Sequence, residues 1–279
     1  MKVKLKQLFS RFPIVTVIVL SVILMWGSSV DLGNEMWVRI AKRMVLGSIA
    51  VSVLLIAGGK EALAWRKKSV RAVLLIGAYP LLLALFGAFM AYSNSPMIVK
   101  NDRIVLLISY FIFSFSVGLF EEGLCRGIIM NGFVKALPKT KAGLYGAVII
   151  SSFIFGFIHV MWDVSSIPVN PLPVFVQIIS KTVDAGALGM LLAAVYLKTK
   201  NIWTAVIIHT LYDYFLFLAT VFGKLGNVTI SAQYVDAGVI MNQQMLLKHA
   251  FIFLLAVPNI IIAVIVLRKL EPSKCVIWE

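Results

Sequence analysis

The sequence predicts an all-α membrane protein, a polytopic bundle of about eight transmembrane helices. Hydrophobic residues make up 61% of the 279 residues and charged residues only 14%, and the mean hydropathy is +0.96. Soluble chains carry about 25% charged residues. Apolar runs recur here at close to the ~20 residues that a helix needs to cross a bilayer. A chain of this length suits one membrane domain rather than several.

Eight apolar runs are predicted to cross the membrane: residues 13–30, 44–58, 72–92, 104–130, 143–165, 172–196, 201–221 and 247–267. The first run follows a basic N-terminal stretch, as in a signal peptide, but Gly27-Ser28-Ser29 is a weak cleavage site, so we predict a retained helix. We divide the chain into accessory spans at 1–103, a core at 104–221 that holds the polar motifs, and an outer loop with the last span at 222–279.

The distribution of basic residues predicts that both termini are cytoplasmic. With the N-terminus inside, most of the 26 lysine and arginine residues fall on the inner side, as the positive-inside rule requires. The net charge of +14 then reflects topology and attraction to anionic lipid, and no nucleic-acid partner is predicted. The basic stretch 39–43 falls on the outer side and contradicts this topology. The alternative is a protein with six spans, in which the first two runs do not cross the membrane fully.

Two adjacent carboxylates and an arginine follow an uncharged run of sixteen residues, 104–119. A charge in hydrocarbon costs about 2.5–3.5 kcal/mol on insertion scales, so three charges together need an explanation. Glu122 and Arg126 are four residues apart and share a helix face, which predicts a structural ion pair. Glu121 projects from another part of the helix surface and remains free for chemistry. The alternative is a cytoplasmic helix end, where such charges are ordinary.

Two of the three histidines fall within apolar runs, at His159 and His209. Asp213 lies four residues after His209 on the same helix face, where its carboxylate can accept a hydrogen bond from one ring nitrogen and orient the other. Phe155 shares a face with His159 and is expected to wall the site. Each histidine has a plainer interpretation as a residue that hydrogen-bonds between helices. Another intramembrane pair, Lys181 with Asp184, is predicted to be structural because of its spacing.

A glutamate and two histidines on three separate helices have two chemical uses. They can hold Zn²⁺ and leave a position open for water. Alternatively, Glu121 is itself the general base for a water, and the histidines polarise the scissile carbonyl. Both uses lead to peptide-bond hydrolysis inside the membrane. The three side chains can meet only if the helix with Glu121 continues to about Phe133, and we expect the helix with His159 to run on toward Ser165.

These residues form three motifs, which resemble those of the CAAX protease and bacteriocin-processing family (CPBP, or Abi) of intramembrane proteases. The motifs are Glu121-Glu122-x-x-x-Arg126, Phe155-x-x-x-His159 and His209-x-x-x-Asp213. The resemblance covers about residues 104–215. It implies a helical membrane protease with Glu121, His159 and His209 as catalytic residues and as tentative Zn²⁺ ligands. It also implies supporting roles for Glu122, Arg126, Phe155 and Asp213. Many members have asparagine in place of Asp213, which here adds a negative charge.

The resemblance implies a membrane-associated peptide or protein as substrate. The short chain looks more like bacterial members, which implies a bacterial plasma membrane and a role in bacteriocin self-immunity or peptide maturation. Two alternatives from other classes are a non-catalytic bacteriocin immunity protein and an ion-coupled transporter. Intramembrane carboxylates and histidines also serve ion relays. The paired, broken helices that are typical of transporters are not visible in the sequence.

Overall fold

A computed structural model describes residues 7, 9, 11–65, 67–93, 103–222 and 235–278. Within these ranges the chain folds into helices and contains no strand, which confirms the predicted all-α class. The α-helices are α2 (Pro13–Ser29), α3 (Met36–Ile56), α4 (Lys67–Ile76), α5 (Ala78–Ser93), α6 (Arg103–Glu122), α7 (Asn131–Ala136), α8 (Lys141–Ile158), α9 (Pro171–Thr199), α10 (Ile202–Phe222) and α11 (Gln243–Arg268). Short 3-10 turns lie at Gly59–Leu63, Asp163–Ser166 and Pro272–Cys275.

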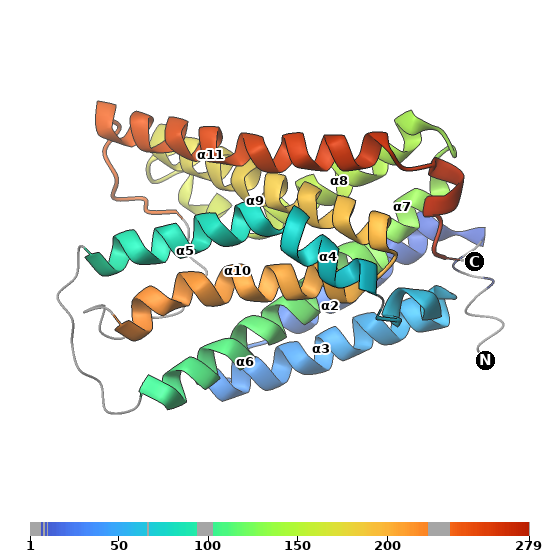
Figure 1. Cartoon of the computed structure of the whole chain (residues 1–279). Coiled ribbons are helices and arrows are strands. Elements are labelled where there is room, and N and C mark those ends of the chain that lie inside the picture. Colours follow the sequence, from blue (N-terminus) through green and yellow to red (C-terminus); the bar gives the residue numbers. More distant parts are fainter. Residues whose placement is uncertain are drawn as a thin grey trace.

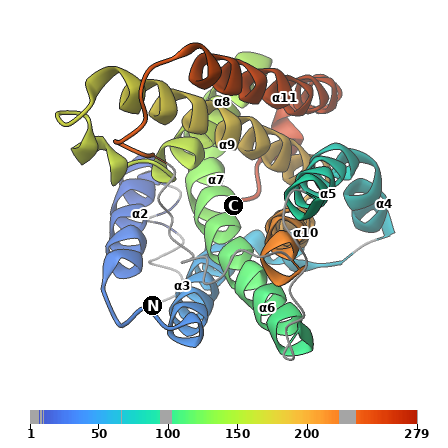
Figure 2. The ribbon, with the colours of Figure 1, turned by 90° about the vertical axis from the view of Figure 1, so that its left-hand side faces the viewer.

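The long helices lie side by side in one bundle (Figure 1). Seen from one end (Figure 2), α6 and α7 run through the middle of the bundle, and α8, α9 and α11 stack on one side of them. Helix α6 packs against α3 and α10, and α9 packs against α8 and α11. The motif-bearing helices α6, α8 and α10 each pack against other helices of the bundle on one side, while many large apolar side chains, including Ile149 and Phe153 of α8, are exposed, as lipid contact requires.

Helices α6 and α7 form one continuous helix, from Arg103 to Ala136, because a π-helix, Gly123–Met130, joins them. All eight residues of the π-helix are buried. The helix therefore continues past Arg126, as the proposed meeting of the three side chains requires. A π-helix is rare in proteins and is often found at functional sites. Here it follows immediately after the two adjacent glutamates.

Fewer helices than predicted are long and apolar enough to cross a membrane. In the described residues there are five such helices, or six if α4 and the start of α5, which are bent by 51°, form one broken span. The bend lies at Gly77, between the two helices. Helix α2 has only 17 residues, and the first half of α3 carries three basic residues. This result agrees with the six-span alternative better than with eight spans.

Helix α8 ends at Ile158, so the prediction that it runs on toward Ser165 is wrong. His159 is its C-cap residue, and turns and a 3-10 helix at Asp163–Ser166 follow. Serine and aspartate favour such turns because their side chains compete for backbone hydrogen bonds. The Ser165 hydroxyl indeed donates to the carbonyl oxygen of Trp162 at 3.0 Å. His159 therefore lies at the end of its helix rather than inside it.

Helices α8 and α9 approach each other very closely at two glycines. A Cβ atom added to Gly156 of α8 would meet the carbonyl oxygen of Thr182 on α9 and lie 3.0 Å from the backbone nitrogen of Gly186. A Cβ on Gly186 would lie 3.2 Å from the carbonyl oxygen of Ser152. Small residues at such contacts allow membrane helices to pack backbone against backbone. This contact fixes the height and rotation of the helix end that carries His159.

Candidate active site

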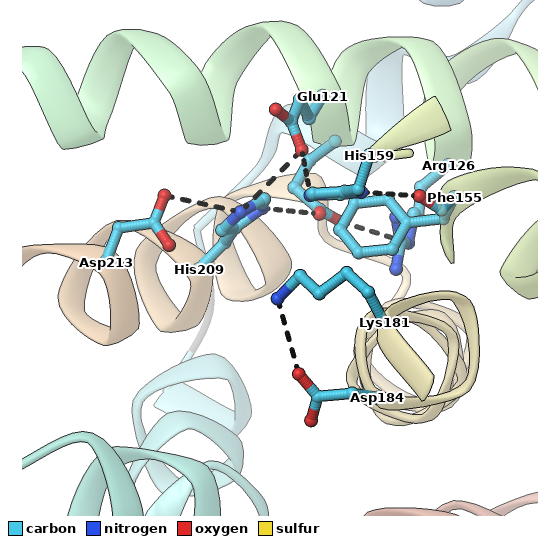
Figure 3. A network of polar contacts seen from close by, with 9 residues as sticks. Glu121, Arg126, Phe155, His159, Lys181, Asp184, His209 and Asp213 are labelled. Atoms are coloured by element: carbon cyan, nitrogen blue, oxygen red, sulfur yellow. Dashed lines mark hydrogen bonds and ion pairs between the residues drawn. The ribbon is translucent and has the colours of Figure 1, made fainter. Parts of the chain in front are cut away.

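The structure brings the three predicted catalytic side chains together in the bundle interior (Figure 3). Glu121 lies near the end of α6, His159 caps α8 and His209 lies on α10. The Oε2 atom of Glu121 is 3.6 Å from Nε2 of His159 and 3.9 Å from Nε2 of His209. Glu121 and His159 are partly exposed, whereas the His209 side chain is buried. Residues that are 38 and 88 positions from Glu121 thus converge on one carboxylate oxygen.

Glu122 contacts two partners and is completely buried. Its Oε2 atom lies 3.0 Å from Nε of Arg126, which forms the predicted ion pair at i,i+4 spacing. Its Oε1 atom lies 2.9 Å from Nδ1 of His209, on another helix. Sequence reasoning missed this second contact, because no spacing rule connects residues that are 87 positions apart. Glu122 is therefore both a partner of the arginine and the group that orients His209.

Arg126 is fully buried, and its guanidinium contacts three neighbours. Besides the Glu122 carboxylate, its Nη2 donates a hydrogen bond of 2.7 Å to the carbonyl oxygen of Gly189 on α9. Its guanidinium carbon lies 4.5 Å from the centre of the Phe155 ring, a cation–π contact. A buried guanidinium is tolerated only with such partners. Arg126 thereby links the π-helix to α8 and α9.

The hydrogen bonds at Nδ1 determine what both imidazoles present to Glu121. Nδ1 of His159 lies 2.7 Å from the carbonyl oxygen of Phe155, and Nδ1 of His209 lies 2.9 Å from the Glu122 carboxylate. Carbonyl and carboxylate oxygens accept hydrogen bonds, so both Nδ1 atoms donate. In a neutral imidazole the Nε2 atom is then an acceptor. Two Nε2 atoms and the Glu121 carboxylate therefore surround one position with hydrogen-bond acceptors.

Asp213 lies near His209 but does not have the orienting contact predicted for it. Its Oδ2 atom is 3.5 Å from Nε2 of His209, while Nδ1 is held by Glu122. The orienting carboxylate therefore comes from α6, and Asp213 lies on the same side of the His209 ring as Glu121.

Phe155 has the position predicted for it as an aromatic wall of the site. Its ring centre is 4.9 Å from that of His159 and 5.6 Å from that of His209.

Lys181 and Asp184 form the predicted pair on α9, with Nζ 3.3 Å from Oδ2. Figure 3 shows that this pair lies beside the histidines, with the Lys181 side chain extending toward them. Both side chains of the pair are partly exposed. The ion pair therefore forms part of the polar surroundings of the site, a position that the three-residue spacing alone does not reveal.

The side chains predicted to bind Zn²⁺ are chemically suitable but are not placed as a ligand group. Two acceptor Nε2 atoms and a carboxylate, each imidazole with a hydrogen bond at Nδ1, are typical zinc ligands. However, the described residues contain no set of three histidine, cysteine, aspartate or glutamate side chains arranged to hold one metal ion. We therefore derive no step through a metal, and Zn²⁺ at this site remains the alternative that the metal-removal experiment below tests.

A helical bundle in which a carboxylate and two imidazoles converge is compatible with the chemistry of an intramembrane hydrolase. Residues 103–215 match the family described as type II CAAX prenyl endopeptidase Rce1-like. This region is similar to the CAAX protease family of membrane endopeptidases, in agreement with the resemblance predicted from the three motifs. The match spans α6 to the middle of α10 and includes all three motifs. No curated protein and no solved structure matches the chain.

Proposed function

We propose that this protein hydrolyses a peptide bond in a membrane-associated peptide or protein, with Glu121 activating the attacking water. The observation that carries the proposal is the environment of one atom. Oε2 of Glu121 is buried and has no hydrogen-bond partner among the described residues. Two imidazole Nε2 atoms face it at 3.6 and 3.9 Å. A buried polar oxygen usually has a partner, so one without any indicates a position where a reactant binds.

A water at this position has a defined orientation. It donates one hydrogen to Oε2 of Glu121 and the other to an Nε2 atom, because both are acceptors, and its lone pair is then directed away from them. As its oxygen bonds to the scissile carbonyl carbon, the proton passes to Glu121. The C–N bond then breaks, and Glu121 returns this proton to the leaving amine, which regenerates the carboxylate. The second imidazole, when it is in the imidazolium form with protons on both ring nitrogens, donates from Nε2 to the carbonyl oxygen while this oxygen carries negative charge.

The remaining motif residues hold this arrangement in place. Glu122 orients His209, and Arg126 neutralises Glu122 within the low-dielectric interior. Phe155 lies against both histidine rings and against the Arg126 guanidinium, which limits water around them. The buried surroundings strengthen each of these interactions relative to bulk water.

We place the protein in a bacterial plasma membrane, as a multi-pass protein with both termini cytoplasmic. The proposed biological roles are self-immunity against a bacteriocin and maturation of a peptide, both of which require cleavage of a peptide at the membrane. The basic inner loops and the many exposed apolar side chains on the outer helices support a membrane setting. The experiment below separates these roles, because it identifies the cleaved chain.

The proposal predicts new protein N-termini that depend on Glu121. Membranes from cells that make the wild-type protein are compared with membranes from cells that make Glu121→Gln, which keeps the shape of the side chain but removes its basic oxygen. We expect a set of N-termini in the wild-type sample only. Glu271→Gln is the matched control, because Glu271 is exposed and its side chain pairs with the surface residues Lys274 and Ser273. Identical N-termini in wild-type and Glu121→Gln membranes, with both proteins well expressed, would contradict the proposal.

The same mechanism predicts that metal removal leaves the activity intact. Dialysis of purified protein against a zinc chelator is expected to leave the cleavage rate unchanged, because water activation here uses the Glu121 carboxylate itself. The measurement is the rate before and after dialysis, together with the zinc content of the protein by mass spectrometry. Loss of activity that returns on addition of zinc would instead assign Glu121, His159 and His209 as metal ligands.

A further inference from the structure

The segment after α11 returns to the bundle and buries a tryptophan. Trp278 is only 1% exposed and is among the largest fully buried side chains. Its indole packs edge-on against the ring of Phe9, with 5.0 Å between ring centres. Gly132 of α7 makes room for it, since a Cβ there would lie 3.3 Å from the indole Cζ3 atom. A tryptophan outside any helix is thus built into the core beside the π-helix.

The indole also makes a directed polar contact with the π-helix. Its Nε1 donates a hydrogen bond of 3.2 Å to the carbonyl oxygen of Gly127. The same carbonyl accepts a hydrogen bond of 3.1 Å from Nδ2 of Asn131. The main-chain oxygen of Trp278 accepts a hydrogen bond of 3.2 Å from Nζ of Lys135. Trp278 is therefore held to the π-helix through its indole and to α7 through its main chain.

A short chain of contacts connects this indole to the candidate active site. Gly127 directly follows Arg126 in the sequence. Arg126 contacts Glu122 at 3.0 Å, and the other oxygen of Glu122 holds His209 at 2.9 Å. Each contact in this chain is between buried groups. A displacement of Gly127 would therefore move the group that orients a histidine of the site.

Each hydrogen bond of a π-helix spans one more residue than in an α-helix, and the pattern is rare, so we expect it to depend on contacts from outside the segment. If the segment relaxed to an α-helix, the side chains before and after it would rotate relative to each other by about 100°, the angle per residue. Glu121 and Glu122 precede the segment, and Arg126 lies within it. An α-helical register keeps Glu122 and Arg126 on one face, so the relaxed segment would instead move Arg126 away from Gly189 and Phe155.

We infer that Trp278 is a positioning residue, which holds the π-helix in the register that lets Arg126 and Glu122 orient His209. The inference rests on the proposed function for its effect on rate, but the orientation of His209 is testable without any activity. The deciding variant is Trp278→Phe, which keeps most of the volume and removes the N–H donor. If Trp278 served only to fill space in the core, this exchange would leave the orientation of His209 and the kcat unchanged.

The expected result has two parts. In Trp278→Phe the kcat for a peptide that the wild type cleaves falls about three- to tenfold with KM unchanged, the effect of one lost hydrogen bond. In detergent micelles, the ring-nitrogen resonances of His209 shift in ¹⁵N-histidine spectra, which are simple because the chain has only three histidines. His209→Gln assigns these resonances. Lys274→Ala is the matched control in the same segment, and it is expected to change neither readout.

The outcomes separate the two proposals. Unchanged His209 resonances, or unchanged kcat in an active enzyme, would overturn the positioning role even if the thermal midpoint falls. If the wild type cleaves nothing, the proposed function fails and the resonances alone decide whether Trp278 orients His209. If Trp278→Phe does not fold, Lys135→Met replaces it, since it releases the main chain of Trp278 and leaves the indole in place. For Lys135→Met we then expect the His209 resonances to shift and the kcat to be about two- to threefold lower than in the wild type.

Discussion

Replacement of Arg126 by methionine is expected to unfold the protein under conditions in which the wild type is folded, and to abolish its activity. Methionine fills a similar volume but leaves the Glu122 carboxylate without its cation and the Gly189 carbonyl without its donor. Removal of one partner from a buried ion pair costs about 3–5 kcal/mol. The measurement is thermal unfolding of the purified protein in detergent, together with the cleavage rate.

Two further variants define the reason for this loss. Arg126→Lys keeps the charge but not the planar contact with Phe155 and the directed bond to Gly189, so we expect intermediate stability. The double variant Glu122→Leu with Arg126→Met removes both charges and is expected to regain much of the stability. It should remain inactive because His209 loses its orienting carboxylate. A single Arg126→Met variant as stable as the wild type would disprove the structural importance of the pair.

The second large effect is expected for Gly156→Ala. The added methyl group would collide with the carbonyl oxygen of Thr182 on α9, and backbone atoms cannot move aside as a side chain can. Helices α8 and α9 must then separate or rotate. Overpacking of this kind costs about 1–3 kcal/mol, occasionally more. His159 is three residues further along the chain, so its ring would also leave its place beside Glu121, and we expect cleavage to fall below detection.

Gly146→Ala provides the matched control on the same helix. A Cβ at Gly146 would lie 3.5 Å from Cδ1 of Leu137, an ordinary contact. Alanine is favoured over glycine in a helix interior by about 0.5–1 kcal/mol, so this variant should be as stable as the wild type or more stable. Thermal midpoints and cleavage rates of the two variants are compared side by side. Equal behaviour of both would show that the α8–α9 contact adapts without cost.

Helical spacing predicted those parts of the site that are local in sequence. The pairing of Glu122 with Arg126 and of Lys181 with Asp184, and the shared face of Phe155 and His159, all follow from a separation of three or four residues. The apolar runs likewise predicted the helices, because the bilayer requires a minimum hydrophobic length. The contact between Glu122 and His209 depends on how α6 packs against α10, which no spacing within one helix determines.

Three other features also lay beyond sequence reasoning. The π-helix has no distinct residue pattern, since its buried residues are also compatible with an α-helix. The early end of α8 depends on turns formed by side chains such as Ser165. The bend at Gly77 coincides with a close approach to Ile208 of α10, where an added Cβ would lie 2.9 Å from Cγ1. At the π-helix and at Gly77, tertiary contacts accompany one of the local conformations that the sequence permits, whereas α8 is followed by turns with local hydrogen bonds.

The local ion pair on α6 and the π-helix has a consequence for the biogenesis of the protein. Chains are made from the N-terminus, so the segment with Glu122 and Arg126 enters the membrane before α9 and α10 exist. Its later partners, Gly189 and His209, are supplied only 63 and 87 residues further on. Because Glu122 and Arg126 neutralise each other within a single helical turn, the segment carries its own counterion during this interval. The same pair that later orients His209 thus lowers the energy barrier to insertion of the nascent helix.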